Sequence, residues 1–138
     1  MTVSAAARLY ARHQDVPSAS WRWPNFKPSE IACKGTGSVL VVPEALDALQ
    51  ALRTRLGRPL VIKSGYRSPE HNERVGGARA SKHMEGAAFD IECRPDQQAA
   101  LIFAAKDVGF RGFGRYDTFV HVDLGPARTW DERTSATK

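Results

Sequence analysis

Apolar residues recur at steps of three and four across Pro43–Leu56, and this spacing predicts an amphipathic helix. Pro43 suits the first turn of that helix, and Gly57 suits its end. A second helix is predicted over Asp96–Val108, because Gly109 follows its last apolar position. Shorter helical segments are predicted at Ala5–Arg12, Lys27–Ile31 and Glu70–Val75.

Three short apolar runs are typical of β-strands: Leu60–Ile62, Ala87–Cys93 and Phe119–Leu124. Glycine, serine and proline separate them and predict loops, most clearly at Ser64–Pro69 and Gly109–Tyr116. The predicted order of helix, strand, strand, helix and strand indicates an α+β fold, with a small antiparallel sheet and flanking helices.

The length of 138 residues is that of one domain. We expect this domain at residues 21–130, after an N-terminal extension at residues 1–20 and before a C-terminal tail at residues 131–138 that frays. The aromatic segment Trp21–Phe26 predicts an extended strap that closes the core, with the wall of a ligand groove as the alternative.

The chain carries 20 Lys and Arg against 15 Asp and Glu, which gives a net charge of +5 and favours polyanionic surroundings. These charges are scattered and form no basic tail, so we expect no nucleic-acid partner. The first ten residues lack the pattern of a secretory signal, and no apolar run approaches the length of a spanning helix. We therefore expect synthesis in the cytoplasm and no transmembrane segment.

Cysteine usage does not predict a metal site. Cys33 and Cys93 lie far apart, and neither belongs to a C-x-x-C pair. Reduced thiols are therefore expected, with a disulfide as the alternative. His71 is expected to be structural or to face a substrate rather than to bind metal.

The candidate chemistry lies in His83, Asp90 and His121. Two imidazoles and a carboxylate match a zinc site that has three protein ligands and an open fourth position. Gly86 allows the chain to turn between the first two of these residues. On a strand, His121 shares its face with Asp123, which is therefore placed to orient the histidine or to reach a metal-bound water.

The pattern S-x-H-x-x-G-x-A-x-D at Ser81–Asp90, with His121 downstream, resembles the signature of the zinc D-alanyl-D-alanine carboxypeptidase family. That family shares its hedgehog/DD-peptidase-like fold with vancomycin-resistance dipeptidases and the zinc domain of hedgehog proteins. Ser64–Asn72 and His121–Trp130 are similar to small peptidoglycan peptidases of bacteria and phages. The resemblance covers residues 24–130.

The resemblance implies a role for several side chains. His83, Asp90 and His121 match the zinc ligands. Arg67 matches an arginine that polarises the scissile carbonyl and stabilises its oxyanion, and Ser81 matches a substrate-contacting serine. Tyr66, beside this arginine, either donates a hydrogen bond in the cleft or fills it.

The general base is the point of departure from the family. Relatives often carry an acidic residue three positions before the last histidine ligand, where this chain has Thr118. Asp117 and Asp123 remain as candidates. Asp123 is favoured because it shares a strand face with His121, although it could instead orient that ligand.

The resemblance thus implies a Zn²⁺-dependent peptidoglycan peptidase, a DD-carboxypeptidase or endopeptidase that cuts stem-peptide or cross-link amide bonds. We expect it to be a monomer. The alternative is a non-catalytic zinc-bearing module that binds the cell wall. A cell-wall or periplasmic substrate without a secretory signal further suggests a phage or prophage endolysin.

Overall fold

The computed structural model describes residues 7–134. Helix α2 (Pro43–Leu56) has the bounds expected from its apolar spacing, and Gly57 ends it in the left-handed conformation, with φ of 67°. Helix α4 (Pro95–Asp107) begins one residue before the predicted start, because proline has a helical φ and needs no hydrogen-bonded N–H in the first turn. Both long helices are therefore confirmed.

The remaining helical segments are α1 (Pro28–Ile31), α3 (Pro69–Arg74) and the 3-10 turns η1 (His13–Asp15), η2 (Ser18–Ser20) and η3 (Lys82–Glu85). The strands within residues 7–134 are β1 (Arg8–Tyr10), β2 (Val39–Val41), β3 (Ile62–Ser64), β4 (Ala88–Glu92), β5 (Gly112–Arg115), β6 (Phe119–Asp123) and β7 (Arg128–Asp131). β1 and β2 form a small antiparallel pair, and the others form one sheet in the order β3-β4-β6-β5-β7.

The larger sheet is mixed. β3, β4, β6 and β5 pair in antiparallel fashion, but β7 runs parallel to β5. The α+β class is thus confirmed, and the small antiparallel sheet is present, extended at one edge by the parallel strand β7.

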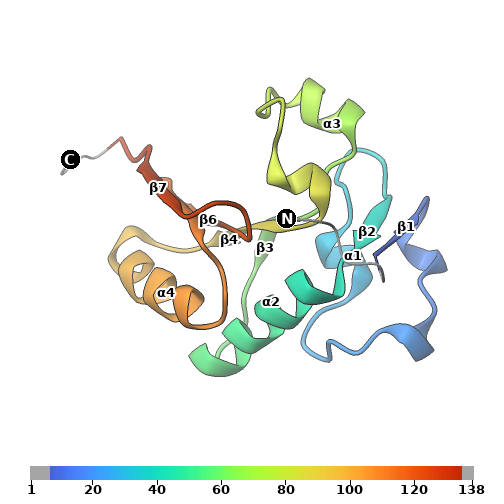
Figure 1. Cartoon of the computed structure of the whole chain (residues 1–138), viewed down its shortest axis with the longest axis horizontal. Coiled ribbons are helices and arrows are strands. Elements are labelled where there is room, and N and C mark those ends of the chain that lie inside the picture. Colours follow the sequence, from blue (N-terminus) through green and yellow to red (C-terminus); the bar gives the residue numbers. More distant parts are fainter. Residues whose placement is uncertain (1–6, 135–138) are drawn as a thin grey trace.

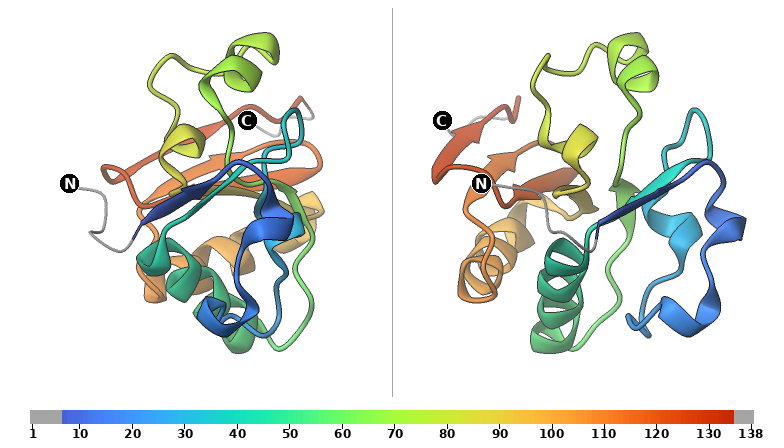
Figure 2. Two further views of the ribbon diagram at one scale, coloured as in Figure 1. Left: turned by 90° about the vertical axis from the view of Figure 1, so that its right-hand side faces the viewer. Right: turned by 45° about the vertical axis from the view of Figure 1, so that its right-hand side comes forward.

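The two faces of the sheet have different neighbours. α2 and α4 cover one face, whereas α3 and η3 lie on the opposite side (Figures 1 and 2). The buried core includes residues from these two helices and the sheet, among them Leu46, Leu49, Leu101, Val120 and Val122. The polar site described below involves η3 and the central strands.

The predicted helix at Ala5–Arg12 is wrong for the part of it that the structure describes. Arg8–Tyr10 is strand β1, and Leu9 pairs with Leu40. Tyr10 also packs against the core. This pairing and packing override the helix propensity of the alanine-rich segment, whose first residues lie outside the described range.

Two segments predicted to be irregular are ordered. Gly109–Tyr116 contains strand β5, and the tail expected from residue 131 begins inside β7. Arg133 and Thr134 are held by hydrogen bonds to Asp131 and Asp117, and residues 135–138 lie outside the described range. The strand predicted at Leu60–Ile62 is shifted to Ile62–Ser64.

Two other expectations about the fold are confirmed, the buried aromatic strap and the unpaired cysteines. Trp23 and Phe26 are buried in the core, in agreement with the strap interpretation. Cys33 and Cys93 are both free and buried. Within residues 7–134, every helix is too short or too polar to span a membrane.

Candidate metal centre

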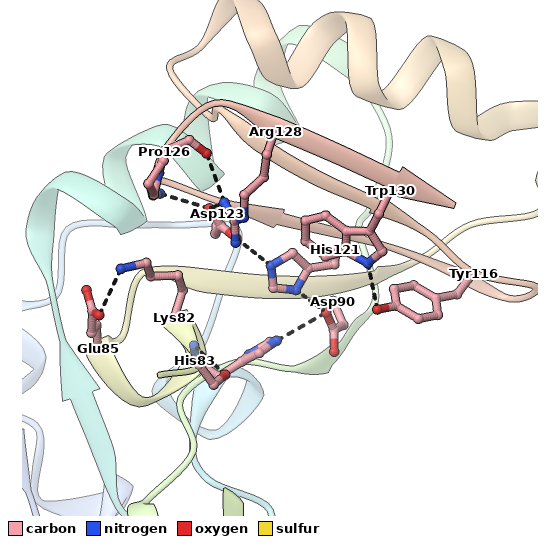
Figure 3. A network of polar contacts seen from close by, with 12 residues as sticks. Lys82, His83, Glu85, Asp90, Tyr116, His121, Asp123, Pro126, Arg128 and Trp130 are labelled. Carbon is pink, nitrogen blue, oxygen red and sulfur yellow. Dashed lines mark hydrogen bonds and ion pairs between the residues drawn. The ribbon is translucent and has the colours of Figure 1, made fainter. Parts of the chain in front are cut away.

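Three ionisable side chains converge on the face of the sheet opposite α2 and α4. Asp90 on β4 is the direct antiparallel partner of His121 on β6. His83 lies on η3, and Gly86, with φ of 68°, turns the chain from η3 into β4. One ligand atom from each of the three residues lies within 4.8 Å of the other two (Figure 3). The register of β4 and β6 therefore assembles the predicted ligand set.

The geometry around Asp90 is close enough to enclose a metal ion. Its Oδ1 lies 3.2 Å from Nε2 of His83 and 3.0 Å from Nδ1 of His121. The three residues are between 2% and 9% exposed. Buried polar groups at this spacing need either one another or a cation as partners.

The outer nitrogen of each histidine has a hydrogen-bond partner that fixes the ring. Nδ1 of His83 donates to the carbonyl oxygen of Gly65 at 2.7 Å, and Nε2 of His121 donates to Oδ2 of Asp123 at 2.6 Å. With a metal ion bound, each ring can therefore present its other, unprotonated nitrogen to that ion; without one, the same nitrogens carry a proton toward Asp90. Outer hydrogen bonds of this kind orient metal-binding histidines, and a donor set of two nitrogens and one carboxylate fits Zn²⁺.

Asp123 lies behind His121 and is fully buried. Its Oδ1 accepts hydrogen bonds from the Gly125 backbone N–H and from Arg128 at 2.8 and 3.0 Å. Its Oδ2 accepts from Arg128 at 2.8 Å in addition to His121. Both carboxylate oxygens are thus already occupied, on the side of the imidazole away from Asp90 (Figure 3).

Asp117, the other acidic candidate, is exposed in the turn between β5 and β6. It accepts hydrogen bonds from the backbone N–H and the hydroxyl of Thr134, both at 2.8 Å. Asp117 and Asp123 are both absent from the lining of the cleft around the three ligands.

The electrostatics of the centre follow from its crowded charges. Burial alone would raise the pKa of Asp90, but hydrogen bonds from His121 and His83 and their positive charge hold that pKa well below its usual range. Burial alone would lower the pKa of His121, but the adjacent Asp123 and Asp90 raise it overall. The two carboxylates therefore favour positive charge on or beside the His121 ring, which a proton supplies in the absence of a cation.

A cleft of about 460 Å³ opens above these ligands. Besides the ligands, its lining includes the cationic residues Arg67, Lys82 and Arg128, the aromatic residues Tyr116, Phe119 and Trp130, and Ser81. Nη2 of Arg67 lies 3.5 Å from Oδ2 of Asp90. Oγ of Ser81 accepts from the His83 N–H and so caps η3.

Tyr66 is the one implied substrate residue that the fold leaves outside the cleft lining. It is 7% exposed, and burial raises its pKa. Conversely, the cleft contains Lys82, Tyr116 and Phe119, which the sequence analysis did not propose. Lys82 directly precedes the ligand His83 in the motif, so the sequence contained a signal for its place in the cleft. Tyr116 follows β5, a strand that the sequence pattern did not predict.

Comparison with known proteins identifies the family of this chain. A family model described as Peptidase M15 matches residues 24–123. The zinc D-Ala-D-Ala carboxypeptidase of Streptomyces albus G is 36% identical over 88 residues, which are 59% of this chain and 34% of that protein. The peptidoglycan L,D-endopeptidase MepK of Escherichia coli K12 is 35% identical over 97 residues, which are 64% of this chain and 53% of that protein.

The chain thus spans between about a third and about half of the length of these curated relatives. The family model, however, covers well over half of the chain, including His83, Asp90 and His121. The protein belongs to the Peptidase M15 family.

Proposed function

We propose that this protein is a zinc-dependent peptidoglycan peptidase that hydrolyses an amide bond in a stem peptide or in a cross-link between stem peptides. The observation that carries the proposal is the group of His83, Asp90 and His121 at an open cleft, with both imidazoles held in the tautomer that metal binding requires. The names of two relatives support this class of substrate: one is a zinc D-Ala-D-Ala carboxypeptidase and the other is a peptidoglycan L,D-endopeptidase.

His83, Asp90 and His121 would hold the zinc ion, which when bound acts as a Lewis acid and lowers the pKa of water. Arg67 lines the same cleft, and we assign it to polarising the scissile carbonyl. Its guanidinium is held by Asn72 and Ser64 at 3.1 and 3.3 Å, so it is oriented before substrate arrives. Ser81 is assigned to the backbone of the bound peptide.

Asp123 is proposed to orient His121 rather than to act as the general base. Its two oxygens already accept four hydrogen bonds, and its side chain has no exposed surface. Asp117 is assigned no catalytic step, because it is exposed in a turn outside the cleft lining.

The charge of the cleft supports an anionic substrate. Apart from the ligand Asp90, the charged residues in its lining are Arg67, Lys82 and Arg128. Stem peptides carry free carboxylates, which these cations would attract. We propose that the protein acts at the cell wall as a monomer. A role in phage release stays a prediction, which assays on infected cells would test.

The test is hydrolysis of purified murein, followed by mass spectrometry of the released fragments. We expect one type of amide bond to be cut, activity to disappear on chelation, and zinc to restore it. His13→Ala provides a control, because this histidine lies in η1, outside the ligand group and the cleft lining. Activity that survives complete removal of metal would contradict the proposal.

A second candidate is a non-catalytic zinc module that binds the cell wall. It is favoured by one observation: in the described part of the chain, Asp90 is the single carboxylate that lines the cleft. A zinc-loaded protein that sediments with insoluble murein but releases no fragment would establish this alternative.

A further inference from the structure

One aromatic residue in the cleft has an unused hydrogen-bond donor. Tyr116 follows β5 and is half-buried in the cleft lining. Its ring stacks on Phe119, with centroids 4.4 Å apart and planes inclined by 8°. The tyrosine ring is therefore held against the wall of the cleft.

The hydroxyl of Tyr116 is oriented by the neighbouring strand. Nε1 of Trp130 donates a hydrogen bond to Oη of Tyr116 at 2.9 Å. An indole N–H is only a donor, so the phenol oxygen is the acceptor and its own proton points elsewhere. Within residues 7–134 no side-chain or backbone acceptor takes up that proton.

The oriented hydroxyl lies beside the metal centre. The ring of Trp130 is 5.2 Å from the ring of the ligand His121. Figure 3 shows the hydroxyl of Tyr116 on the side of its ring that is directed toward Trp130 and Asp90. Its free proton is thus available to a group bound over the three ligands.

A buried glutamine holds the backbone of Tyr116. Gln98 on α4 is completely buried, and its Nε2 donates to the carbonyl oxygen of Tyr116 at 2.8 Å. Its Oε1 accepts from Arg115 at 3.2 Å. A fully buried amide is tolerated only when it is satisfied in this way, so the turn that presents Tyr116 is tied to the core.

The charged side chains of the cleft already have partners. Lys82 pairs with Glu85 at 3.1 Å, and Arg128 is bound to Asp123. Ser81 caps η3. Besides the Ser81 hydroxyl, which is assigned above to the peptide backbone, Tyr116 is therefore a neutral donor left for a substrate.

We propose that Tyr116 is a catalytic residue whose hydroxyl donates a hydrogen bond to the carbonyl oxygen of the scissile amide, alongside Arg67. This inference rests on the proposed amide hydrolysis. A fixed donor aimed at the oxygen stabilises the negative charge that develops there, and loss of one such donor typically lowers kcat by about 10²–10³-fold. The bond strengthens as charge develops, so the effect falls on kcat more than on KM.

The experiment compares Tyr116→Phe with the parent on a soluble stem peptide. We expect kcat to fall by about 10²–10³-fold, with KM within a few-fold and zinc content and Tm unchanged. A phosphinate analogue of the tetrahedral intermediate should lose affinity by a similar factor. Tyr10→Phe removes the same atom far from the cleft and should change nothing. Trp130→Phe removes the orienting donor together with part of the ring beside His121, and at full zinc content it should lower kcat less than Tyr116→Phe.

Two results would overturn the inference in distinguishable ways. An active parent with Tyr116→Phe at full kcat contradicts the role of Tyr116 and leaves the peptidase proposal standing. A zinc-loaded parent that hydrolyses no stem peptide contradicts the proposed function and this role with it.

Discussion

Replacing Asp123 by asparagine keeps the shape of a fully buried side chain and removes its negative charge. The native carboxylate accepts four hydrogen bonds, from His121, from the Gly125 backbone and twice from Arg128. An asparagine amide has one acceptor oxygen and one NH₂ group in place of the two acceptor oxygens. Each oxygen of the native carboxylate accepts from two donors. Whichever way the amide is turned, its NH₂ group therefore faces two N–H donors that it cannot accept from.

The two orientations of the amide both weaken the metal centre. With its oxygen toward His121, the NH₂ group opposes the Gly125 N–H and one Arg128 nitrogen, which pushes the side chain out of place. With the NH₂ group toward His121, Nε2 must become an acceptor, so the ring proton moves to Nδ1. That proton then occupies the nitrogen that faces Asp90.

The expected loss is 10–100-fold in zinc affinity, about 1.4–2.7 kcal/mol, the range for removing the partner of a metal-binding histidine. Zinc affinity is measured by competition with a chromophoric chelator, and murein hydrolysis is measured over a range of free zinc. If Asp123 only orients His121, high zinc restores most of the activity of Asp123→Asn.

Asp117→Asn is the matched control, because it makes the same chemical change at an exposed aspartate bonded to Thr134. We expect parental zinc affinity and activity in this variant. Native zinc affinity in Asp123→Asn together with lost kcat at every zinc concentration would refute the orienting role and make Asp123 the general base.

Two further predictions concern packing and protonation. A methyl group at Gly114 would overlap the indole of Trp130, so Gly114→Ala should lower the free energy of unfolding by about 1–3 kcal/mol, measured by urea denaturation, and reduce murein hydrolysis. Burial acts to raise the pKa of Cys33, but hydrogen bonds, first from the Ser68 backbone, lower it to about 7. Because an unfolded thiol titrates near 8.5, this lowered pKa adds stability that is complete above that pH and is lost as pH falls through 7. The parent should therefore gain more stability than Cys33→Ser between pH 7 and 9, and equal gains would contradict the lowered pKa.

The metal centre could be predicted because its information is local. His83 and Asp90 lie in one short motif, and His121 lies on a strand with clear alternation. The α2 helix could also be predicted, because its apolar face repeats over four turns and meets no competing signal.

Strand β5 could not be predicted, because its glycines are typical of loops. Gly112 and Gly114 are in the strand because Asp123 and Trp130 fill the space that a side chain would need. That requirement comes from neighbouring strands and has no local signature. The failure to recognise β5 also concealed Tyr116, which follows it.

The role of Asp123 depends on tertiary contacts as well. Strand alternation places it on the same face as His121, and the two side chains do meet. Arg128 and the Gly125 backbone, which follow in the chain, then occupy its remaining acceptor sites. A pattern of alternating residues cannot distinguish a carboxylate that faces the cleft from one enclosed behind a ligand.

Zinc content of the purified protein tests the central claim most directly, with His83→Ala and His71→Ala measured beside it. Our account predicts one zinc per chain in the parent and in His71→Ala, because His71 lies outside the ligand group, and almost none in His83→Ala. Full zinc content in His83→Ala, or a parent that binds no zinc when zinc is in excess, would contradict it.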